Sequence, residues 1–108
     1  NKGAILEAID RLHEEGDLAR LIQIRLLWPF PVEELTPLLD RAAPLIVVEC
    51  NYSGQLAHLI RAQTGYHSDY LVVKYNGRPM SGQELYRVFK DIHQGRGESR
   101  IVLRNPNE

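Results

Sequence analysis

The amino-acid sequence predicts a three-layer α/β/α domain built on an open, mostly parallel β-sheet. Helical and strand-like patterns alternate along its 108 residues, and such alternation is typical of parallel strands joined by helices. The predicted strands are nearly continuous apolar runs, as expected of strands covered on both faces. Right-handed crossovers are expected to place helices on both faces of this sheet. The length corresponds to one domain of common size.

The first predicted helix covers residues 2–15. Apolar side chains recur at i, i+3, i+4 and i+7 and form one stripe, which consists of Ile5, Ala8, Ile9 and Leu12. Gly16 is a natural C-terminal cap. A run dense in β-favouring residues follows at 21–28. The prolines at positions 29 and 31 end this predicted strand, because proline donates no hydrogen bond to a ladder.

A second helix is predicted from about residue 32 to residue 41. Pro37 would disrupt the interior of this helix, because proline lacks the backbone N–H and its ring clashes with the preceding turn. We therefore predict that the helix proper starts at Thr36, with Thr36 as its N-cap and Pro37 at the first helical position.

The clearest buried strand is LIVVE at residues 45–49, since four consecutive branched aliphatic side chains of this length favour a covered strand. The turn CNYSG leads from it into a helix that Gly65 ends. Another strand is predicted at 70–75, and the Asn76-Gly77 pair after it is a strong turn signal.

The last predicted helix begins after Ser81 and reaches about His93. Ser81 caps it, and Glu84, three residues later, completes a capping box. Residues 1–95 are expected to form the domain, and residues 96–108 a polar C-terminal tail. Because the chain opens on a helix and three strands make a small sheet, we expect the fold to lack its first strand, which would precede Asn1.

Composition argues against several classes of protein. Thirteen basic and fourteen acidic residues give a net charge of −1, which argues against a nucleic-acid partner. One cysteine excludes an internal disulfide framework and a cysteine-rich zinc ribbon, and it fits a reducing compartment. No apolar run approaches the eighteen residues or so of a membrane span, and the charged N-terminal residues do not resemble a signal peptide. We therefore expect a cytoplasmic protein without a membrane partner.

The strongest candidate site in the sequence follows the strand predicted at 45–49. It is a loop, for a ligand or for an interface, that consists of Asn51, Tyr52, Ser53, Gly54 and Gln55. Ligands of open α/β sheets bind at the carboxyl ends of strands, and helix N-termini attract anions. Asn51 or Ser53 could cap the helix, and Gly54 would permit close approach to the backbone. The alternative is that these residues only cap and turn. The glycines of a phosphate fingerprint and the lysine of a P-loop are absent.

Two residues close to this loop admit both a chemical and a structural interpretation. Glu49 could act as an acid or base, but no second acid pairs with it, and this favours a salt bridge or a backbone cap. Cys50 could be a nucleophile beside His58, but no distinctive motif surrounds either residue, and this favours a small, inert buried thiol. The four histidines show no metal-ligand spacing.

Two further residues are candidates for contacts. Arg78, in the NGRP turn, could pair with a carboxylate across a subunit interface, reach a phosphate, or remain exposed with little energetic role. Trp28, with Phe30 and two prolines, forms a large rigid apolar surface, either for this domain's own core or for docking. The sequence predicts no catalytic, cofactor-binding or metal-binding residue in this chain.

Three segments together resemble a known family: IRLLWPFPVEEL, LIVVECNYSGQLAHLIRAQTG and VVKYNGRPMSGQEL. In this order they are similar to the C-terminal part of the α subunit of 2-oxoacid:ferredoxin oxidoreductases, with the 2-oxoglutarate type nearest. The resemblance spans about Gly3 to Ile92, and NYSGQL and YNGRP are its specific pieces. The sequence departs from the family pattern at Asn76, usually an acidic residue, and at Met80, often an aromatic one.

The resemblance implies a fold similar to the transketolase C-terminal domain. It also implies a complex that decarboxylates a 2-oxoacid on thiamine diphosphate with Mg²⁺, passes electrons through iron–sulfur clusters to ferredoxin, and transfers the acyl group to coenzyme A. In that family the cofactor pocket is formed mainly by other α-subunit domains and by the partner β subunit. The absence of a cluster-binding cysteine set, an acidic magnesium motif and a glycine-rich loop from this sequence agrees with that division.

Two hypotheses about function follow. In the first, the chain is a C-terminal assembly domain of such an α subunit, inactive on its own. In the alternative, it is a freestanding α/β module that binds a small anion at the Asn51–Gln55 loop.

Overall fold

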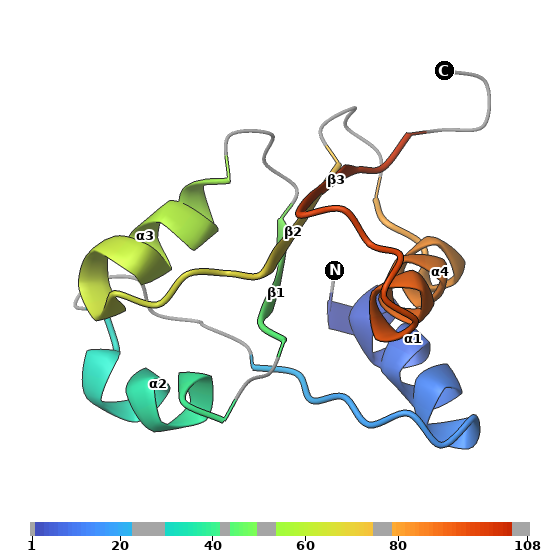
Figure 1. Ribbon diagram of the computed structural model, residues 1–108, viewed down its shortest axis with the longest axis horizontal. Coiled ribbons are helices and arrows are strands. Elements are labelled where there is room, and N and C mark those ends of the chain that lie inside the picture. The colour runs from blue at the N-terminus through green and yellow to red at the C-terminus, as the bar shows by residue number, and fades with distance from the viewer. Residues whose placement is uncertain (1, 23–29, 42–43, 50–53, 75–78, 105–108) are drawn as a thin grey trace.

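The computed structural model (Figure 1) describes residues 2–22, 30–41, 44–49, 54–74 and 79–104. Its elements, in chain order, are α1 (Lys2–Glu14), α2 (Val32–Leu39), β1 (Ile46–Glu49), α3 (Gln55–Thr64), β2 (Tyr70–Val73), α4 (Gly82–His93) and β3 (Arg100–Val102). The described strands are parallel and lie in the order β1-β2-β3. The predicted α/β class with a parallel sheet is confirmed.

Side chains of the strands alternate between two apolar clusters on opposite faces of the sheet. Val48 and Val72 pack towards α1 and α4, whereas Val47 and Leu71 pack towards α2 and α3. Figure 1 shows the same arrangement, with one pair of helices on either side of the strands. The predicted three-layer arrangement is therefore confirmed.

The two helical crossovers differ in hand. Because strand order follows chain order, two crossovers of one hand would place α3 and α4 on the same face. The two helices lie on opposite faces, so the connections β1–α3–β2 and β2–α4–β3 have opposite hands. Helices cover both faces as expected, but the expectation that right-handed crossovers place them there is wrong for one of these two connections. α4 lies on the same face of the sheet as α1, and its apolar side chains pack against those of α1.

The packing of α1 on α4 forms the larger apolar cluster. The predicted stripe of α4 is buried, and it consists of Leu85, Val88, Phe89 and Ile92. From α1, Ala8 and Leu12 join the same cluster. Leu12 and Leu85 are both fully buried, so the contact between these helices is a main apolar contribution to stability.

A polar cluster joins the end of α1 to the middle of α4. The hydroxyl of Tyr86 donates to both carboxylate oxygens of Glu15 at 2.6 and 2.8 Å. Lys90 Nζ lies 2.7 Å from Asp17 Oδ2 and 3.5 Å from Glu15 Oε1. The hydrogen bond from Tyr86 lowers the pKa of Glu15, and the hydrogen bond to Asp17 raises the pKa of Lys90. Glu15 is exposed and the other three groups are only half-buried, so solvent screening limits what these contacts add to stability.

The prediction for the start of the second helix is wrong. α2 begins at Val32, follows Pro31 as N-cap, and contains Pro37 in its interior. Thr36 does not cap this helix; its Oγ1 donates to the carbonyl of Val32 at 2.8 Å. Pro37 removes only one intrahelical hydrogen bond, and burial of Leu35 and Leu39 against the α3 side of the sheet offsets that loss.

The sheet continues into the region predicted to be a polar tail. Residues 100–102 form β3, and Ile101 aligns with Val72 of β2. The backbone N–H of Leu103 also donates to the carbonyl of Val73 at 2.8 Å. The short apolar run at 101–103 is therefore sufficient for pairing beside a strand that is already buried, and assigning all of 96–108 to a tail is wrong.

The strand predicted at 21–28 lies almost wholly outside the described residues. Its first two residues, Leu21 and Ile22, belong to no strand. Ile22 instead packs against the cluster formed by α2 and α3. In the described ranges, no helix is both long and apolar enough to cross a membrane.

The α1–α4 contact yields a stability prediction. Replacing Leu85 by alanine should lower the free energy of unfolding by about 3 kcal/mol, because a fully buried leucine leaves a cavity. Leu18, which is 84% exposed, is the control, and Leu18→Ala should change that free energy by less than about 0.5 kcal/mol. Urea unfolding followed by circular dichroism measures both, and equal losses would contradict the assigned core.

Candidate functional site

The candidate loop follows β1 at the carboxyl edge of the sheet. Of the residues singled out from the sequence, Asn51, Tyr52, Ser53, Arg78 and Trp28 lie outside the described residues. Gly54 and Gln55 are described, and they begin α3. The structure therefore defines the two ends of the loop, at Glu49 and at Gly54.

Glu49 is the buried acid at the end of β1, and it is only 7% exposed. Its Oε1 accepts a hydrogen bond from the backbone N–H of Leu56 at 2.6 Å, and its Oε2 accepts one from Ala57 at 3.2 Å. These N–H groups lie in the first turn of α3, where no intrahelical partner exists and negative charge is favoured. The predicted role of Glu49 as a backbone cap is confirmed.

The N-cap of α3 is Gly54, not Asn51 or Ser53 as the sequence suggested. Gly54 has the left-handed backbone conformation, with φ 69° and ψ 39°. A Cβ atom at this position would lie 2.8 Å from Leu71 Cδ2, closer than real contacts allow. The close approach that the glycine permits is therefore made by β2 of the same chain.

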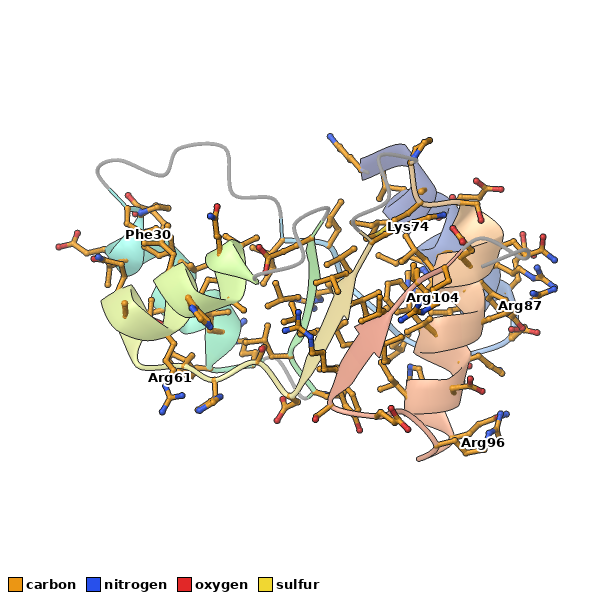
Figure 2. The ribbon with its side chains drawn as sticks, turned by 90° about the horizontal axis from the view of Figure 1, so that it is seen from above. Phe30, Arg61, Lys74, Arg87, Arg96 and Arg104 are labelled. Carbon is orange, nitrogen blue, oxygen red and sulfur yellow. The ribbon has the colours of Figure 1, made fainter. Side chains whose placement is uncertain are left out.

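The neighbouring strand end carries a buried cation that sequence analysis did not single out. Lys74, directly after β2, is 4% exposed. Its Nζ donates to Glu84 Oε1 and Oε2 at 2.9 and 3.1 Å and to the carbonyl of Pro79 at 3.3 Å. Figure 2 shows Lys74 at the end of β2, on the side of the sheet that α1 and α4 cover. A lysine ending an apolar strand was the available signal, since buried lysines require a partner.

Glu84 serves both Lys74 and the first turn of α4. The predicted capping box is confirmed: Ser81 N–H donates to Glu84 Oε2 at 2.9 Å, and Glu84 N–H donates to Ser81 Oγ at 3.1 Å. Burial raises the pKa of Glu84. The hydrogen bonds from Ser81 and Lys74 lower that pKa by more, so that it falls below the usual 4.5.

The ends of β1 and β2 are linked to each other by a backbone hydrogen bond. The backbone N–H of Lys74 donates to the carbonyl of Glu49 at 3.2 Å. In the part of the chain that the structure describes, no buried side-chain nitrogen or oxygen lacks a hydrogen-bond partner. The arrangement therefore fixes the positions of α3 and α4, and its buried charges are already engaged by protein groups.

A hollow of about 280 Å³ lies at the opposite end of the sheet, between α4 and β3. Val88 and Ile101 supply apolar walls, and Asp91 and Arg96 line its rim. These two side chains form an exposed ion pair of 2.8 Å. The hollow carries both signs of charge and lies away from the candidate loop.

Phe30 belongs to the domain's own core. It is 8% exposed and packs with Leu35, Val47 and Ile60, and Figure 2 shows it beside α2. The alternative of a docking surface does not hold for Phe30, while its neighbour Trp28 lies outside the described residues.

These observations define an α/β domain whose strand ends are tied to the helices that follow them. Residues 2–87 match the family described as pyruvate:ferredoxin oxidoreductase core domain II. The match covers most of the sequence, and the chain belongs to this family.

Curated relatives agree with this assignment. Over 102 residues, 94% of the chain, it is 41% identical to a 2-oxoacid:ferredoxin oxidoreductase subunit alpha of Saccharolobus solfataricus. Over the same length it is 43% identical to 2-oxoacid:ferredoxin oxidoreductase 2, subunit alpha, of Aeropyrum pernix. The chain spans 16% of the length of each of these relatives.

The glycine that begins α3 yields a second prediction. Gly65, which ends the same helix, also has positive φ, but its surroundings are open. Gly65→Ala should lower the free energy of unfolding by about 1 kcal/mol through backbone strain. Gly54→Ala should lower it by about 3 kcal/mol, because the collision with Leu71 adds to that strain. Urea unfolding measures both, and equal losses would show that the contact with Leu71 is not limiting.

The capping box yields a prediction for pH. Because the pKa of Glu84 is lower in the folded chain than the ordinary 4.5, its carboxylate stabilises the fold above that pH. The contribution should be lost as pH falls through the folded pKa. Wild type should therefore be more stable than Glu84→Gln at pH 6, and the difference should shrink as pH falls below 4.5. Urea unfolding of both proteins across this range tests it, and a constant difference would contradict the assignment.

Proposed function

We propose that this chain is an assembly domain of the α subunit of a 2-oxoacid:ferredoxin oxidoreductase. Its family membership and the α-subunit relatives support this role. The carboxyl edge of the sheet, with the Asn51–Gln55 loop, packs between subunits and forms one wall of the active-site cleft. The observation that carries the proposal is the internal engagement of Glu49 and Lys74, because both buried charges at these strand ends are already bound by groups of the chain itself.

The proposed reaction of the whole enzyme is oxidative decarboxylation of a 2-oxoacid. Its products are carbon dioxide and an acyl-coenzyme A, and ferredoxin accepts the electrons. The substrate we propose is 2-oxoglutarate, which the resemblance of the segments around NYSGQL and YNGRP to the 2-oxoglutarate type supports. The proposed partners are a β subunit, the remaining α-subunit domains, ferredoxin and coenzyme A, and the proposed location is the cytoplasm.

The described residues of this chain do not fit the cofactors that such an enzyme uses. Among them, no group of three or more His, Cys, Asp or Glu side chains is arranged to hold a metal ion. Glu49 and Lys74, the buried charges nearest the candidate loop, are bound by backbone amides and by Glu84. Thiamine diphosphate, Mg²⁺ and the iron–sulfur clusters therefore belong, in this proposal, to other domains and to the partner subunit.

The geometry does not favour the alternative of a freestanding module that binds a small anion. An anion at the N-terminus of α3 would need the amides of the first turn, and the carboxylate of Glu49 already accepts from two of them. A second negative charge beside that buried carboxylate would be repelled. The assembly role does not require free backbone amides at the N-terminus of α3.

The proposal is tested on the full-length polypeptide that contains this chain, purified from its native source. Reduction of a viologen dye that depends on 2-oxoglutarate and coenzyme A is expected, together with a co-eluting second subunit and iron–sulfur absorbance. The isolated 108 residues should show no activity. Pyruvate serves as the control substrate, and turnover of pyruvate alone would replace 2-oxoglutarate. If no second subunit co-elutes and no dye is reduced, the proposed role is refuted.

A further inference from the structure

β3 forms one edge of the sheet in the described part of the chain. Among the described strands, β2 pairs with a neighbour on each side, whereas β3 pairs only with β2. Figure 2 shows β3 at the edge of the sheet, with α4 beside it. The outer side of an edge strand carries backbone hydrogen-bonding groups, and these are a template for pairing with another strand.

The register of β3 fixes which of its backbone groups face outward. The carbonyl of Ser99 accepts a hydrogen bond from β2 at 2.8 Å, and the N–H of Leu103 donates one to β2 at 2.8 Å. Alternate residues of a strand face the same neighbour, so residues 99, 101 and 103 face β2. Arg100 and Val102 therefore direct their backbone N–H and C=O groups away from β2.

The hollow of about 280 Å³ between α4 and β3 runs along this outer edge. Its lining includes Ile101, whose side chain packs on the α4 side of the sheet, and also Arg100 and Val102, whose side chains point to the other face. A space that touches both sets of residues lies beside the edge of the strand rather than over one face. Val88 and Asp91 of α4 form its other wall. Within the described part of the chain, an extended segment can therefore reach this edge.

The charges that flank β3 complement those of a second, antiparallel copy in one register. Outward-facing residues must meet, so the register changes only in steps of two. When Ile101 lies opposite Ile101 of the second copy, Arg100 meets Val102 and Glu98 meets Arg104. Glu98 and Arg104 are exposed, and neither has an ion-pair partner within the described residues. A slip of two residues would place Arg100 opposite another arginine, and like charges directly opposite each other destabilise strand pairing.

Apolar contacts on the α4 side of the sheet agree with this register. Ile101 and Leu103 are half-buried and already pack against the larger apolar cluster. The two-fold axis brings the Ile101 side chains of the two copies together, and it places Leu103 of the second copy opposite Ser99, beside the hollow. Pairing thus extends the apolar cluster across the axis. The net charge of −1 gives little long-range repulsion between copies.

We propose that β3 is the site at which two copies of this chain associate, by antiparallel pairing of their outer edges into one continuous sheet. The inference goes beyond the proposed function and does not depend on it. In an α subunit, this pairing would join two α subunits.

The test measures the mass of the full-length polypeptide that contains this chain, with any subunit that co-purifies, by sedimentation velocity. Wild type should have the mass of an assembly with two copies of the polypeptide. Glu98→Arg and Arg104→Glu should each weaken the dimer about tenfold, because both symmetric pairs become repulsive. An equimolar mixture of these two variants should restore the dimer, since each pair between unlike copies again joins opposite charges.

A backbone variant tests the strand pairing itself. Val102→Pro removes one outward N–H and keeps the ladder to β2, because proline is tolerated where the N–H of an edge strand faces outward. This variant should abolish the dimer. Val102→Thr keeps the N–H and the shape of the side chain, and it should leave the dimer unchanged. Circular dichroism at the same temperature should show both variants folded.

Three results would overturn the proposal. The first is a wild-type polypeptide with the mass of a single copy at every concentration. The second is a dimer that neither the charge variants nor Val102→Pro weaken, since the copies would then meet elsewhere. The third is a different protein that co-purifies with wild type and Val102→Thr but not with Val102→Pro, since that protein would occupy the edge in place of a second copy.

Dye reduction that depends on 2-oxoglutarate and coenzyme A separates this inference from the proposed function. It is measured on the same preparations, and the variants at positions 98, 102 and 104 should match wild type. Absence of dye reduction and of a second subunit from every preparation would refute the proposed function. The masses of the variants and of their mixture would still decide the pairing of β3.

Discussion

The carboxyl edge of the sheet depends on the contact between the buried Glu49 carboxylate and the first turn of α3. A buried charge is tolerated only when it is paired or hydrogen-bonded. Here the backbone amides of Leu56 and Ala57 supply that compensation at the positive end of a helix dipole. One contact thereby satisfies the acid and the helix terminus together, and it ties a strand to the following helix across the intervening turn.

The second strand end uses the same strategy with the opposite charge. Lys74 is as buried as Glu49, and it reaches Glu84, which also caps α4. The carboxyl ends of parallel strands commonly hold ligands in open α/β sheets. In the described part of this domain, the buried charges at the ends of β1 and β2 are bound by other groups of the same chain.

Sequence reasoning identified several of these features correctly. The capping box of Ser81 and Glu84 follows from local spacing alone, and so does the burial of Leu85 and its neighbours on α4. Glu49 was recognised as a cap, but its partners were not. Lys74 was missed: its place at the end of an apolar strand was a signal of burial, but its partner Glu84 lies ten residues away and only the folded chain brings the two together.

The sequence by itself determined the fold class, most helix boundaries and the family, because periodicity, capping and family-specific segments are local signals. Tertiary structure decided the rest. Residues 100–102 became β3 only because the buried β2 offers them a partner, and α2 kept Pro37 because packing of Leu35 and Leu39 outweighs one lost hydrogen bond. Strand order, the hands of the crossovers and the partners of Glu49 and Lys74 depend on contacts between segments distant in the chain, and local pattern carries no information about them.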